Sequence, residues 1–535
     1  MILDLHGLED GAALHADLCI IGGGPAGISL ALQFADTATS VLLVESGGLE
    51  LERDTQLLAG GENLGLPYWD LEVARLRFLG GSSNHWHNWC GELDEADMLP
   101  RPWVPDSGWP ITRAELTPYY AAARPLVGLG PARSDDWVWQ RMGLSPLPLD
   151  PDHLTVRFWH KHDGRTAFGV AYRARLGAAR NLRVLLHANA TELHADPSGN
   201  LVERVSVRSL GGKAAEIRAR SFVIACGGID SARLLLLSDS VEPAGIGNRH
   251  DLVGRYFMEH PDPLAARVAT ADPLRLLTYL RHVNLLGRQG HAAGICLSPA
   301  AQRREGLLNG SLRLEFTAAA GDASESLRLL RQHWRSQGIG LEMVDDLWRV
   351  VRDVDISAYN LYRRSLHGLS LVPRPENVMA LELLAQVEQS PNPDSRVMLT
   401  RERDALGLRR VGLDWRIADI DKRTLRRLTE KTGAEMVRLG LGILRIEPWL
   451  LDEGLDWGGI PNGGFHHMGT TRMSDDPRKG VVNRDLRVHG VMNLYVASSS
   501  VFPSAGYINP TLTIVALALR LADHLKGLAP AARAF

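Results

Sequence analysis

The fold of this chain is decided by the stretch ADLCIIGGGPAGISLALQFADTATSVLLVESGG, residues 16–48. Apolar runs at 18–21 and 41–44 flank the glycines, and Glu45 follows the second run. The glycines, GGGPAG at 22–27, match G-x-G-x-x-G, which permits a tight turn and brings a pyrophosphate close to the start of a helix. An acidic residue about 20 positions further on binds ribose hydroxyls in such sites. The stretch therefore predicts the strand, turn, helix and strand of a dinucleotide site.

Sequence features further along the chain are needed to distinguish NAD from FAD, because both cofactors use this glycine pattern. Ranges 181–195, 201–207 and 216–225 are expected to form three short strands leading into ACGGIDSARLLLL. A sheet that returns to the cofactor at 225–228 is typical of flavoproteins with two dinucleotide-binding motifs, so FAD is the predicted cofactor. Cys226 is expected to pack rather than to act as a nucleophile, since nothing nearby would activate its thiol.

Composition argues against several other classes of protein. Lys and Arg total 59 and Asp and Glu total 62, so a net charge of −3 gives no general attraction to nucleic acid or anionic lipid. The four cysteines lie far apart without metal-ligand spacing, and neither a disulfide framework nor a metal site is expected. The apolar segment 512–525 is too short to span a bilayer and is expected to form a buried helix. The acidic N-terminus lacks a basic n-region, which predicts a cytoplasmic protein.

Four stretches in order resemble the glucose-methanol-choline (GMC) oxidoreductase family, over nearly the whole chain. They are GGGPAG with ESGG, LGGSSNHW at 79–86, VGRYFMEHP at 253–261, and the C-terminal block that begins FHHMGTTRMS at 465 and contains YINPT at 507–511. The pattern is most similar to the branch of pyranose oxidase and fructose dehydrogenase. Unrelated flavoproteins share the first stretch but not the order and content of the others.

The resemblance implies an α/β fold with a Rossmann-like FAD domain and a second, α+β substrate domain built on an antiparallel sheet. We expect the discontinuous FAD domain to comprise 1–100, 175–261 and 461–535, and the substrate domain to comprise 101–174 and 262–460. The runs at 397–400 and 412–417 alternate as sheet strands do. Residues 324–366 are expected to form a helical, arginine-rich insertion. Trp334 and Trp348 are expected to pack a helix face, and the alternative is that the insertion forms a lid or a partner surface.

In members of this family a histidine accepts the proton of an alcohol while the carbinol C–H leaves as hydride to flavin N5. The pattern F-H-x-x-G-T selects His466 as this base. If the segment is extended, adjacent side chains point to opposite faces, so His467 should pack elsewhere. Asn509 is the second catalytic residue and is expected to cap the following helix, with Pro510 at its first position. That helix would direct its positive end at the flavin.

The glycine turn and the resemblance together predict a set of FAD contacts. His85 is expected beside the flavin, where a covalent link is one alternative and a non-covalent contact the favoured one. Many relatives have an acidic residue where this chain has SSS at 498–500. The predicted contacts are Gly22, Gly24, Pro25, Ala26, Gly27, Glu45, Ser46, Gly81, Ser82, Asn84, His85, Trp86, Ala190, Ala225, Ser499, Asn509, Pro510 and Thr511.

The predicted function is FAD-dependent oxidation of a CH–OH group of a sugar, glycoside or polyol. The electron acceptor is expected to be dioxygen, a quinone or a redox partner protein, with no nucleic acid partner and no membrane span. Two alternatives remain open. One is a tailoring oxidase acting on a secondary-metabolite alcohol, and the other is a redox-neutral, lyase-type flavoprotein of the same fold.

Overall fold

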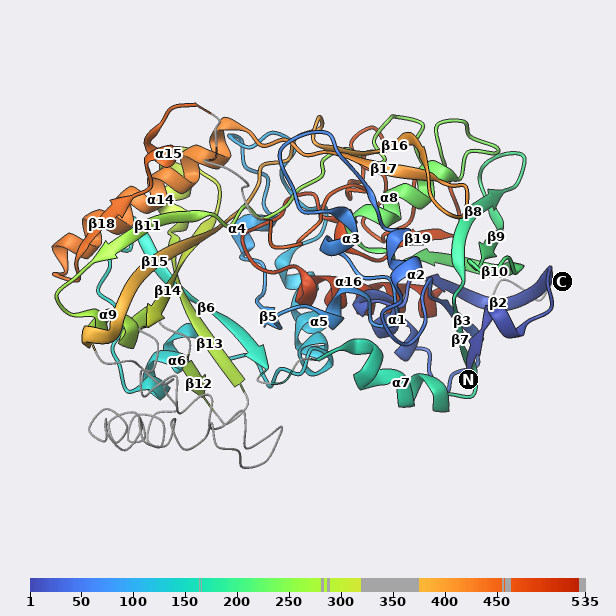
Figure 1. Cartoon of the computed structure of the whole chain (residues 1–535), viewed down its shortest axis with the longest axis horizontal. Helices are drawn as coiled ribbons and strands as arrows, with labels where there is room; N and C mark the ends of the chain where they lie inside the picture. Colours follow the sequence, from blue (N-terminus) through green and yellow to red (C-terminus); the bar gives the residue numbers. More distant parts are fainter. Residues whose placement is uncertain are drawn as a thin grey trace.

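A computed structural model describes residues 1–162, 164, 166–280, 283–285, 289–318, 375–454, 457 and 463–528. The expected insertion at 324–366, with Trp334 and Trp348, lies outside the described residues. The fold is α/β and contains two large sheets, one mostly parallel and one antiparallel, which lie at opposite ends of the molecule in Figure 1.

The mostly parallel sheet contains the glycine turn. Its strand order is β1-β7-β3-β2-β10-β9-β8, and β19 also pairs with β10. Strands β9 and β8 run antiparallel to their neighbours, whereas the other pairs are parallel. The strands are β1 (Ile2–Asp4), β2 (Ala12–Ile21), β3 (Val41–Val44), β7 (Leu182–Leu186), β8 (Asn189–Ala195), β9 (Val202–Arg208), β10 (Ala214–Ile224) and β19 (Leu494–Val496).

The expected strand at 181–195 is two strands. It breaks at His187, which has a left-handed φ of 53°. The imidazole lies between two carboxylates, 2.8 Å from Asp4 and 2.8 Å from Glu52, and these contacts hold the bend. As a result β7 joins the parallel strands, while β8 turns away to pair with β9.

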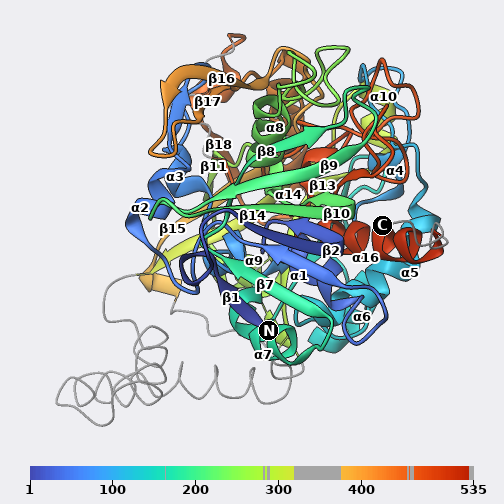
Figure 2. The same ribbon diagram turned by 90° about the vertical axis from the view of Figure 1, so that its right-hand side faces the viewer.

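Helices cover this sheet because strands buried on both faces need an apolar layer on each side. All four residues of β3 are buried. Helix α1 (Pro25–Leu32) packs against β2 and β3, and α7 (Phe168–Ala178) and α16 (Thr511–Gly527) pack against α1 (Figure 2). Helix α5 (Arg113–Leu126) packs against α16, and α8 (Gly227–Leu237) packs against β8.

The antiparallel sheet has the order β18-β11-β15-β14-β13-β6-β5, with β12 paired to β13. Helix α14 (Asp419–Arg438) packs against β14 and β15 (Figure 1). The strands are β5 (Trp89–Cys90), β6 (Leu154–His162), β11 (Leu264–Ala269), β12 (Val283–Leu285), β13 (Gln289–Leu297), β14 (Gly310–Ala318), β15 (Val378–Val387) and β18 (Ile443–Ile446). Within the described part of the chain, the other helices of four or more residues are α2 (Arg53–Leu57), α3 (Leu71–Ala74), α4 (Glu95–Met98), α6 (Asp135–Met142), α9 (Pro273–Leu280), α10 (Pro299–Glu305) and α15 (Pro448–Leu451).

The alternating runs at 397–400 and 412–417 lie in strands, β16 (Arg396–Arg403) and β17 (Arg409–Asp414), with 415–417 beyond the end of β17. They form a separate three-stranded sheet rather than part of the large antiparallel one. Its third strand, β4 (Gly61–Asn63), comes from the N-terminal part of the chain and runs parallel to β17. Pairing between segments about 350 residues apart leaves no local sequence signal.

The C-terminal apolar segment forms α16, and most of its side chains are buried, as expected. Asn509 does not cap this helix, so that prediction was wrong. Pro510 stands at the cap position without a side-chain hydrogen bond, and the Asn509 amide turns to His466 instead. Among the described helices, none has both the length and the apolar character needed to cross a membrane. All four cysteines are unpaired, so no disulfide framework forms.

Candidate active site

The glycine turn follows β2 and leads into α1. Gly22 has a φ of +111°, and a Cβ there would lie 2.5 Å from the carbonyl oxygen of Ala225. A Cβ on Gly27 would lie 1.9 Å from the Gly22 carbonyl oxygen. These two glycines therefore permit the turn and its close packing against the neighbouring strand and helix.

Gly24 serves a different purpose, because a Cβ there would meet no atom within 4 Å. It lines a cavity of about 620 Å³ that extends from the turn to His466 and Asn509. Gly24 is also the N-cap of α1, and because glycine has no side chain, no side-chain hydrogen bond caps the start of this helix. A backbone without side chains at a helix N-terminus is suited to a pyrophosphate.

Glu45 fastens the turn to the end of β3. One carboxylate oxygen accepts the Gly23 N–H at 2.9 Å, and the other accepts the Gly47 N–H at 3.1 Å and the Ser46 hydroxyl at 2.9 Å. Glu45 is buried and lines the cavity together with Ser46. Its carboxylate thus fixes the loop on which a ribose would rest.

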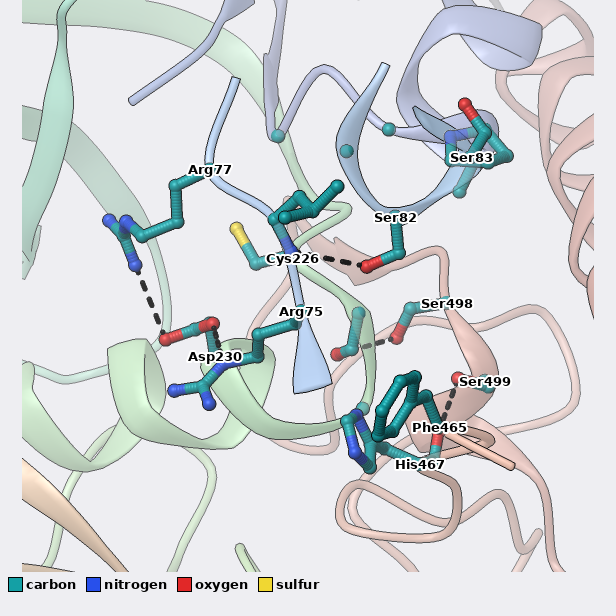
Figure 3. A pocket seen from close by; sticks show the side chains of 18 of the residues that line it. Arg75, Arg77, Ser82, Ser83, Cys226, Asp230, Phe465, His467, Ser498 and Ser499 are labelled. Atoms are coloured by element: carbon teal, nitrogen blue, oxygen red, sulfur yellow. Dashed lines mark hydrogen bonds and ion pairs between the residues drawn. The ribbon is translucent and has the colours of Figure 1, made fainter. Parts of the chain in front are cut away.

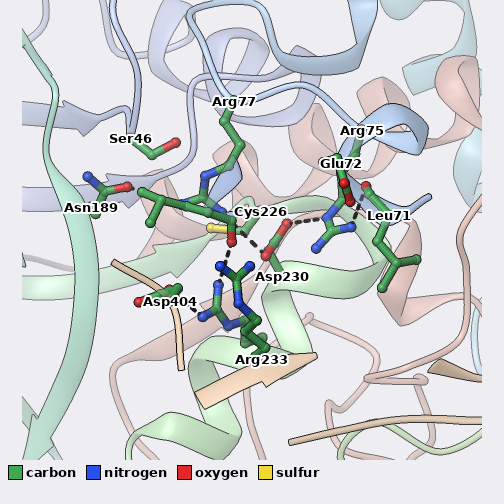
Figure 4. A network of polar contacts seen from close by, with 12 residues as sticks. Ser46, Leu71, Glu72, Arg75, Arg77, Asn189, Cys226, Asp230, Arg233 and Asp404 are labelled. Carbon is green, nitrogen blue, oxygen red and sulfur yellow. Dashed lines mark hydrogen bonds and ion pairs between the residues drawn. The ribbon is translucent and has the colours of Figure 1, made fainter. Parts of the chain in front are cut away.

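The segment at 75–86 forms another wall of the cavity, shown in Figure 3. Arg75 and Arg77 both pair with Asp230 of α8, at 2.7 and 3.4 Å (Figure 4). These arginines hold the pKa of the Asp230 carboxyl well below its usual range despite burial. Arg75 Nη2 and Arg77 Nε are buried and find no hydrogen-bond partner among the described residues. Donors left over in a cavity wall favour a ligand rich in acceptor oxygens.

Cys226 packs at the end of β10, as expected. Its thiol donates to the Ile21 carbonyl at 3.2 Å, and burial raises its pKa to about 12. A thiol of this kind is not a nucleophile at neutral pH.

His466 and Asn509 meet at the far end of the cavity. His466 Nε2 lies 2.9 Å from Asn509 Nδ2, and His466 Nδ1 lies 3.0 Å from His260 Nδ1. Burial, followed by the nearby His260, lowers the pKa of His466 well below the ordinary histidine value. The imidazole is therefore neutral at neutral pH, as a proton acceptor must be.

His467 has other hydrogen-bond partners, although it also lines the cavity, so the expectation that only one of the two histidines faces the cavity is not met. Its Nε2 lies 2.9 Å from the Tyr68 hydroxyl, which donates to Glu259 at 2.5 Å. Ser499 donates to the His467 carbonyl at 2.6 Å and so holds the segment in place (Figure 3). Burial lowers the pKa of His467 to about 3 and raises that of Glu259 to about 7.

His85 lies close to the segment that contains His466 and His467, because its ring stacks on that of Phe465, with 5.7 Å between the ring centroids. Among the predicted residues, Gly27 and Asn84 do not line the cavity. Asn84 donates to the Leu79 and Gly81 carbonyls and shapes the loop. The predicted residues that do line it are Gly22, Gly24, Pro25, Ala26, Glu45, Ser46, Gly81, Ser82, His85, Trp86, Ala190, Ala225, His466, Ser499, Asn509, Pro510 and Thr511.

Several residues of the cavity wall were not found from the sequence. Gln386 of β15 and Arg313 of β14 come from the antiparallel sheet, and Asp262 precedes β11. Burial raises the pKa of Asp262 to about 7. On the other side, Arg233 pairs with Asp404 at 2.6 Å (Figure 4). Gln386, Arg313 and Asp404 stand in no motif identified from the sequence. Arg233, however, lies in ACGGIDSARLLLL, and Asp262 directly follows VGRYFMEHP, so these two stretches held a local signal.

The chain is similar to several known oxidoreductases. Residues 391–518 match the family model described as GMC oxidoreductase. The 6'''-hydroxyparomomycin C oxidase of Streptomyces lividus is 25% identical, over 97% of this chain and 94% of its own. The fructose dehydrogenase large subunit of Gluconobacter japonicus is 23% identical, over 96% and 98%. The chain is thus similar to GMC oxidoreductases through residues 391–518 and to these two enzymes over nearly its whole length.

A solved structure shares the overall fold of this chain. Pyridoxine 4-oxidase from Mesorbium loti superposes with a TM-score of 0.58 at 19% identity, over 96% of this chain and 99% of that one. The residues present fit FAD, the cofactor that the sequence predicts. The open space at Gly24, the unpartnered donors of Arg75 and Arg77, and the length of the cavity all suit a dinucleotide.

One group outside the cavity has donors suited to a metal ion, although the sequence predicted no metal site. Asp4, His6 and His187 bring one ligand atom each within 4.8 Å of one another. His187 already contacts Asp4 and Glu52 through both ring nitrogens, which raises the pKa of its imidazole despite partial burial. An imidazole held between two carboxylates needs no metal to explain it.

Proposed function

We propose that this chain is a GMC oxidoreductase that binds FAD and oxidises the CH–OH group of a small alcohol to a carbonyl. The observation that carries the proposal is the pair His466 and Asn509, 2.9 Å apart on the cavity wall. FAD, when bound, supplies an acceptor for the hydride and its electron pair from the carbinol carbon. His466 Nε2 takes the hydroxyl proton. The carbon–oxygen double bond forms as this proton leaves the oxygen and the hydride leaves the carbon.

The other residues prepare this step. Asn509 Nδ2 is placed to donate to the substrate oxygen beside the base. The N-terminus of α16, at Pro510 and Thr511, lines the same cavity and directs positive potential into it.

The substrate is proposed to be a sugar, glycoside or related polyol. Fructose dehydrogenase and the paromomycin oxidase carry sugar-type substrates in their names, and the cavity wall near His466 is polar. Asp262 Oδ1 and Arg313 Nε are buried without a hydrogen-bond partner among the described residues, and Gln386 lies on the same wall. A substrate with several hydroxyls could satisfy such groups.

An anaerobic screen of alcohols, glycosides and polyols tests the proposal. A substrate should remove the absorbance of oxidised flavin and yield the carbonyl product in equal amount. Conversion of a compound while the flavin stays oxidised would favour the lyase-type alternative. Once a substrate is known, steady-state assays with dioxygen, a quinone or a protein acceptor distinguish the three proposed acceptors.

FAD is proposed to be held without a covalent link, with His85 beside the flavin. Acid precipitation of the protein should leave the yellow colour in the supernatant. Colour in the pellet that moves to the supernatant in His85→Ala would show a covalent bond through this residue. The stacking of His85 on Phe465 already fixes the ring without such a bond.

The domain division is also a proposal. Strands of the parallel sheet fall within 1–100, 175–261 and 461–535, which supports assigning these ranges to FAD binding. Most strands of the antiparallel sheet fall within 101–174 and 262–460, which supports a substrate domain there, although β5 joins that sheet from the first range.

A further inference from the structure

We propose that His260 is a positioning residue that fixes the tautomer of His466, so that the proton sits on Nδ1 and the lone pair on Nε2. The proposal rests on the proposed function for the role of His466 as base. The tautomer itself follows from two chains of hydrogen bonds, each of which begins at a backbone carbonyl.

The first chain begins at Gly506. Its carbonyl oxygen can only accept, and His260 Nε2 lies 2.9 Å from it, so His260 Nε2 carries a proton. His260 is fully buried, and burial lowers its pKa to about 4, so the ring is neutral and its Nδ1 is an acceptor. His466 Nδ1, at 3.0 Å, must then be the donor.

The second chain begins at Tyr507. Gln386 Nε2 donates to the Tyr507 carbonyl at 2.7 Å, which fixes the orientation of the Gln386 amide. The same nitrogen lies 3.3 Å from Asn509 Oδ1. Asn509 therefore presents its Nδ2 to His466 Nε2, and a donor there requires a lone pair on the ring nitrogen.

The two chains reach His466 from opposite sides and require the same tautomer. Their carbonyls belong to neighbouring residues in the loop before α16, although His260 and Gln386 come from distant parts of the chain. Without the acceptor on His260, the ring could hold its proton on Nε2 instead. That form cannot accept the substrate proton at the atom that faces Asn509.

His260 also contributes after the proton has moved. The imidazolium of His466 keeps its Nδ1–H directed at His260, which stabilises the charged ring through a hydrogen bond. The other titratable or charged groups around His466 are His467, Arg313 and Glu259, and Glu259 accepts the His466 backbone N–H at 2.8 Å.

A matched pair of variants separates positioning from a merely structural role. His260→Asn keeps an acceptor at the place of Nδ1 but loses the reach to Gly506, whereas His260→Gln reaches Gly506 but offers no acceptor at Nδ1. With normal FAD content in both, the Asn variant should keep most of the flavin reduction rate. The Gln variant should lose at least about 10²-fold, the lower end of the contribution of a positioned base. The reverse order would overturn the proposal.

A second readout does not depend on turnover. In holoenzyme with histidine labelled with ¹⁵N in the ring, the signals lost in His466→Ala belong to His466. They should show a protonated Nδ1 and an unprotonated Nε2 in the wild type, and a shift toward the other tautomer in His260→Gln. A protonated Nε2 in the wild type refutes the proposal.

The two proposals fail differently. If His466→Ala reduces flavin as fast as the wild type, His466 is not the base and the proposed function fails at this residue. If His466→Ala is slow while His260→Gln matches the wild type in rate and in ¹⁵N signals, only the positioning role fails.

Discussion

His466 and His467 are adjacent in sequence but have different surroundings. His466 contacts Asn509 and His260 at the end of the cavity, whereas His467 contacts Tyr68 and packs near Phe257. Each side chain is therefore held by a different set of residues, although both line the cavity. This difference gives the two histidines separable effects.

His466→Ala should retain FAD but slow flavin reduction by about 10²–10⁴-fold, the usual contribution of a positioned acid or base. His467→Ala should change mainly stability or substrate fit. Since only the neutral ring accepts a proton and the pKa of His466 is depressed, the wild-type rate should persist as pH falls through the ordinary histidine range.

The rate should then fall at a lower pH, and this acid limb should disappear in His466→Ala. Rapid mixing of both variants with substrate across pH measures each effect. A larger loss and a missing acid limb in His467→Ala, with His466→Ala unaffected, would move the catalytic assignment to His467.

The strand-turn-helix unit at 12–32 shows how one short element creates a binding surface. Gly22 and Gly27 are constrained by neighbouring backbone, whereas Gly24 faces open space. Their different environments predict different consequences of substitution, although all three belong to one motif. The position at which a side chain would clash only with the ligand is Gly24.

Gly24→Val should give a folded protein with little bound FAD, because the side chain would occupy the space of the pyrophosphate. Gly177→Val is the matched control, since a Cβ at this position in α7 also meets nothing within 4 Å but lies outside the cavity. The ratio of flavin to protein absorbance after gel filtration measures the effect. Equal ratios in the two variants would show that Gly24 does not face the cofactor.

Local elements could be predicted from the sequence, and long-range contacts could not. The glycine turn, the strands around it and the buried C-terminal helix each have a pattern within about 20 residues. Gln386 has none, because it reaches the cavity only through the pairing of β14 and β15. The cap assigned to Asn509 failed for the same reason, since its amide binds a histidine 43 residues away.

At the scale of the whole molecule, buried charges tie distant segments together. Arg101, between α4 and α5, binds Glu388 at the end of β15 through a bidentate contact, with 2.7 Å for one of its two bonds. Glu388 also accepts the Asn309 N–H before β14. Both charged side chains are almost wholly buried, at 4% and 0% exposure.

Arg101→Leu should destabilise the protein by about 3–5 kcal/mol, because it leaves the Glu388 carboxylate buried without its partner. Arg478→Leu is the control, since that arginine is 76% exposed in its pair with Asp476 and its loss should have little effect. The midpoints of thermal and urea unfolding of the FAD-bound proteins compare the two. A similar small shift for both variants would contradict a major role for the buried pair.

Two main-chain carbonyls in the loop before α16 determine which ring nitrogens of His260 and His466 carry a proton. A point mutation can replace a side chain but cannot remove a peptide carbonyl, so the carbonyls of Gly506 and Tyr507 persist through sequence divergence. The position in this loop that is sensitive to substitution is Gly506, because its φ is +57° and an added Cβ would lie 2.6 Å from the Leu93 side chain. Side-chain substitutions elsewhere in this loop leave both carbonyls present, whereas any residue with a side chain at Gly506 would displace the reference point for both histidines.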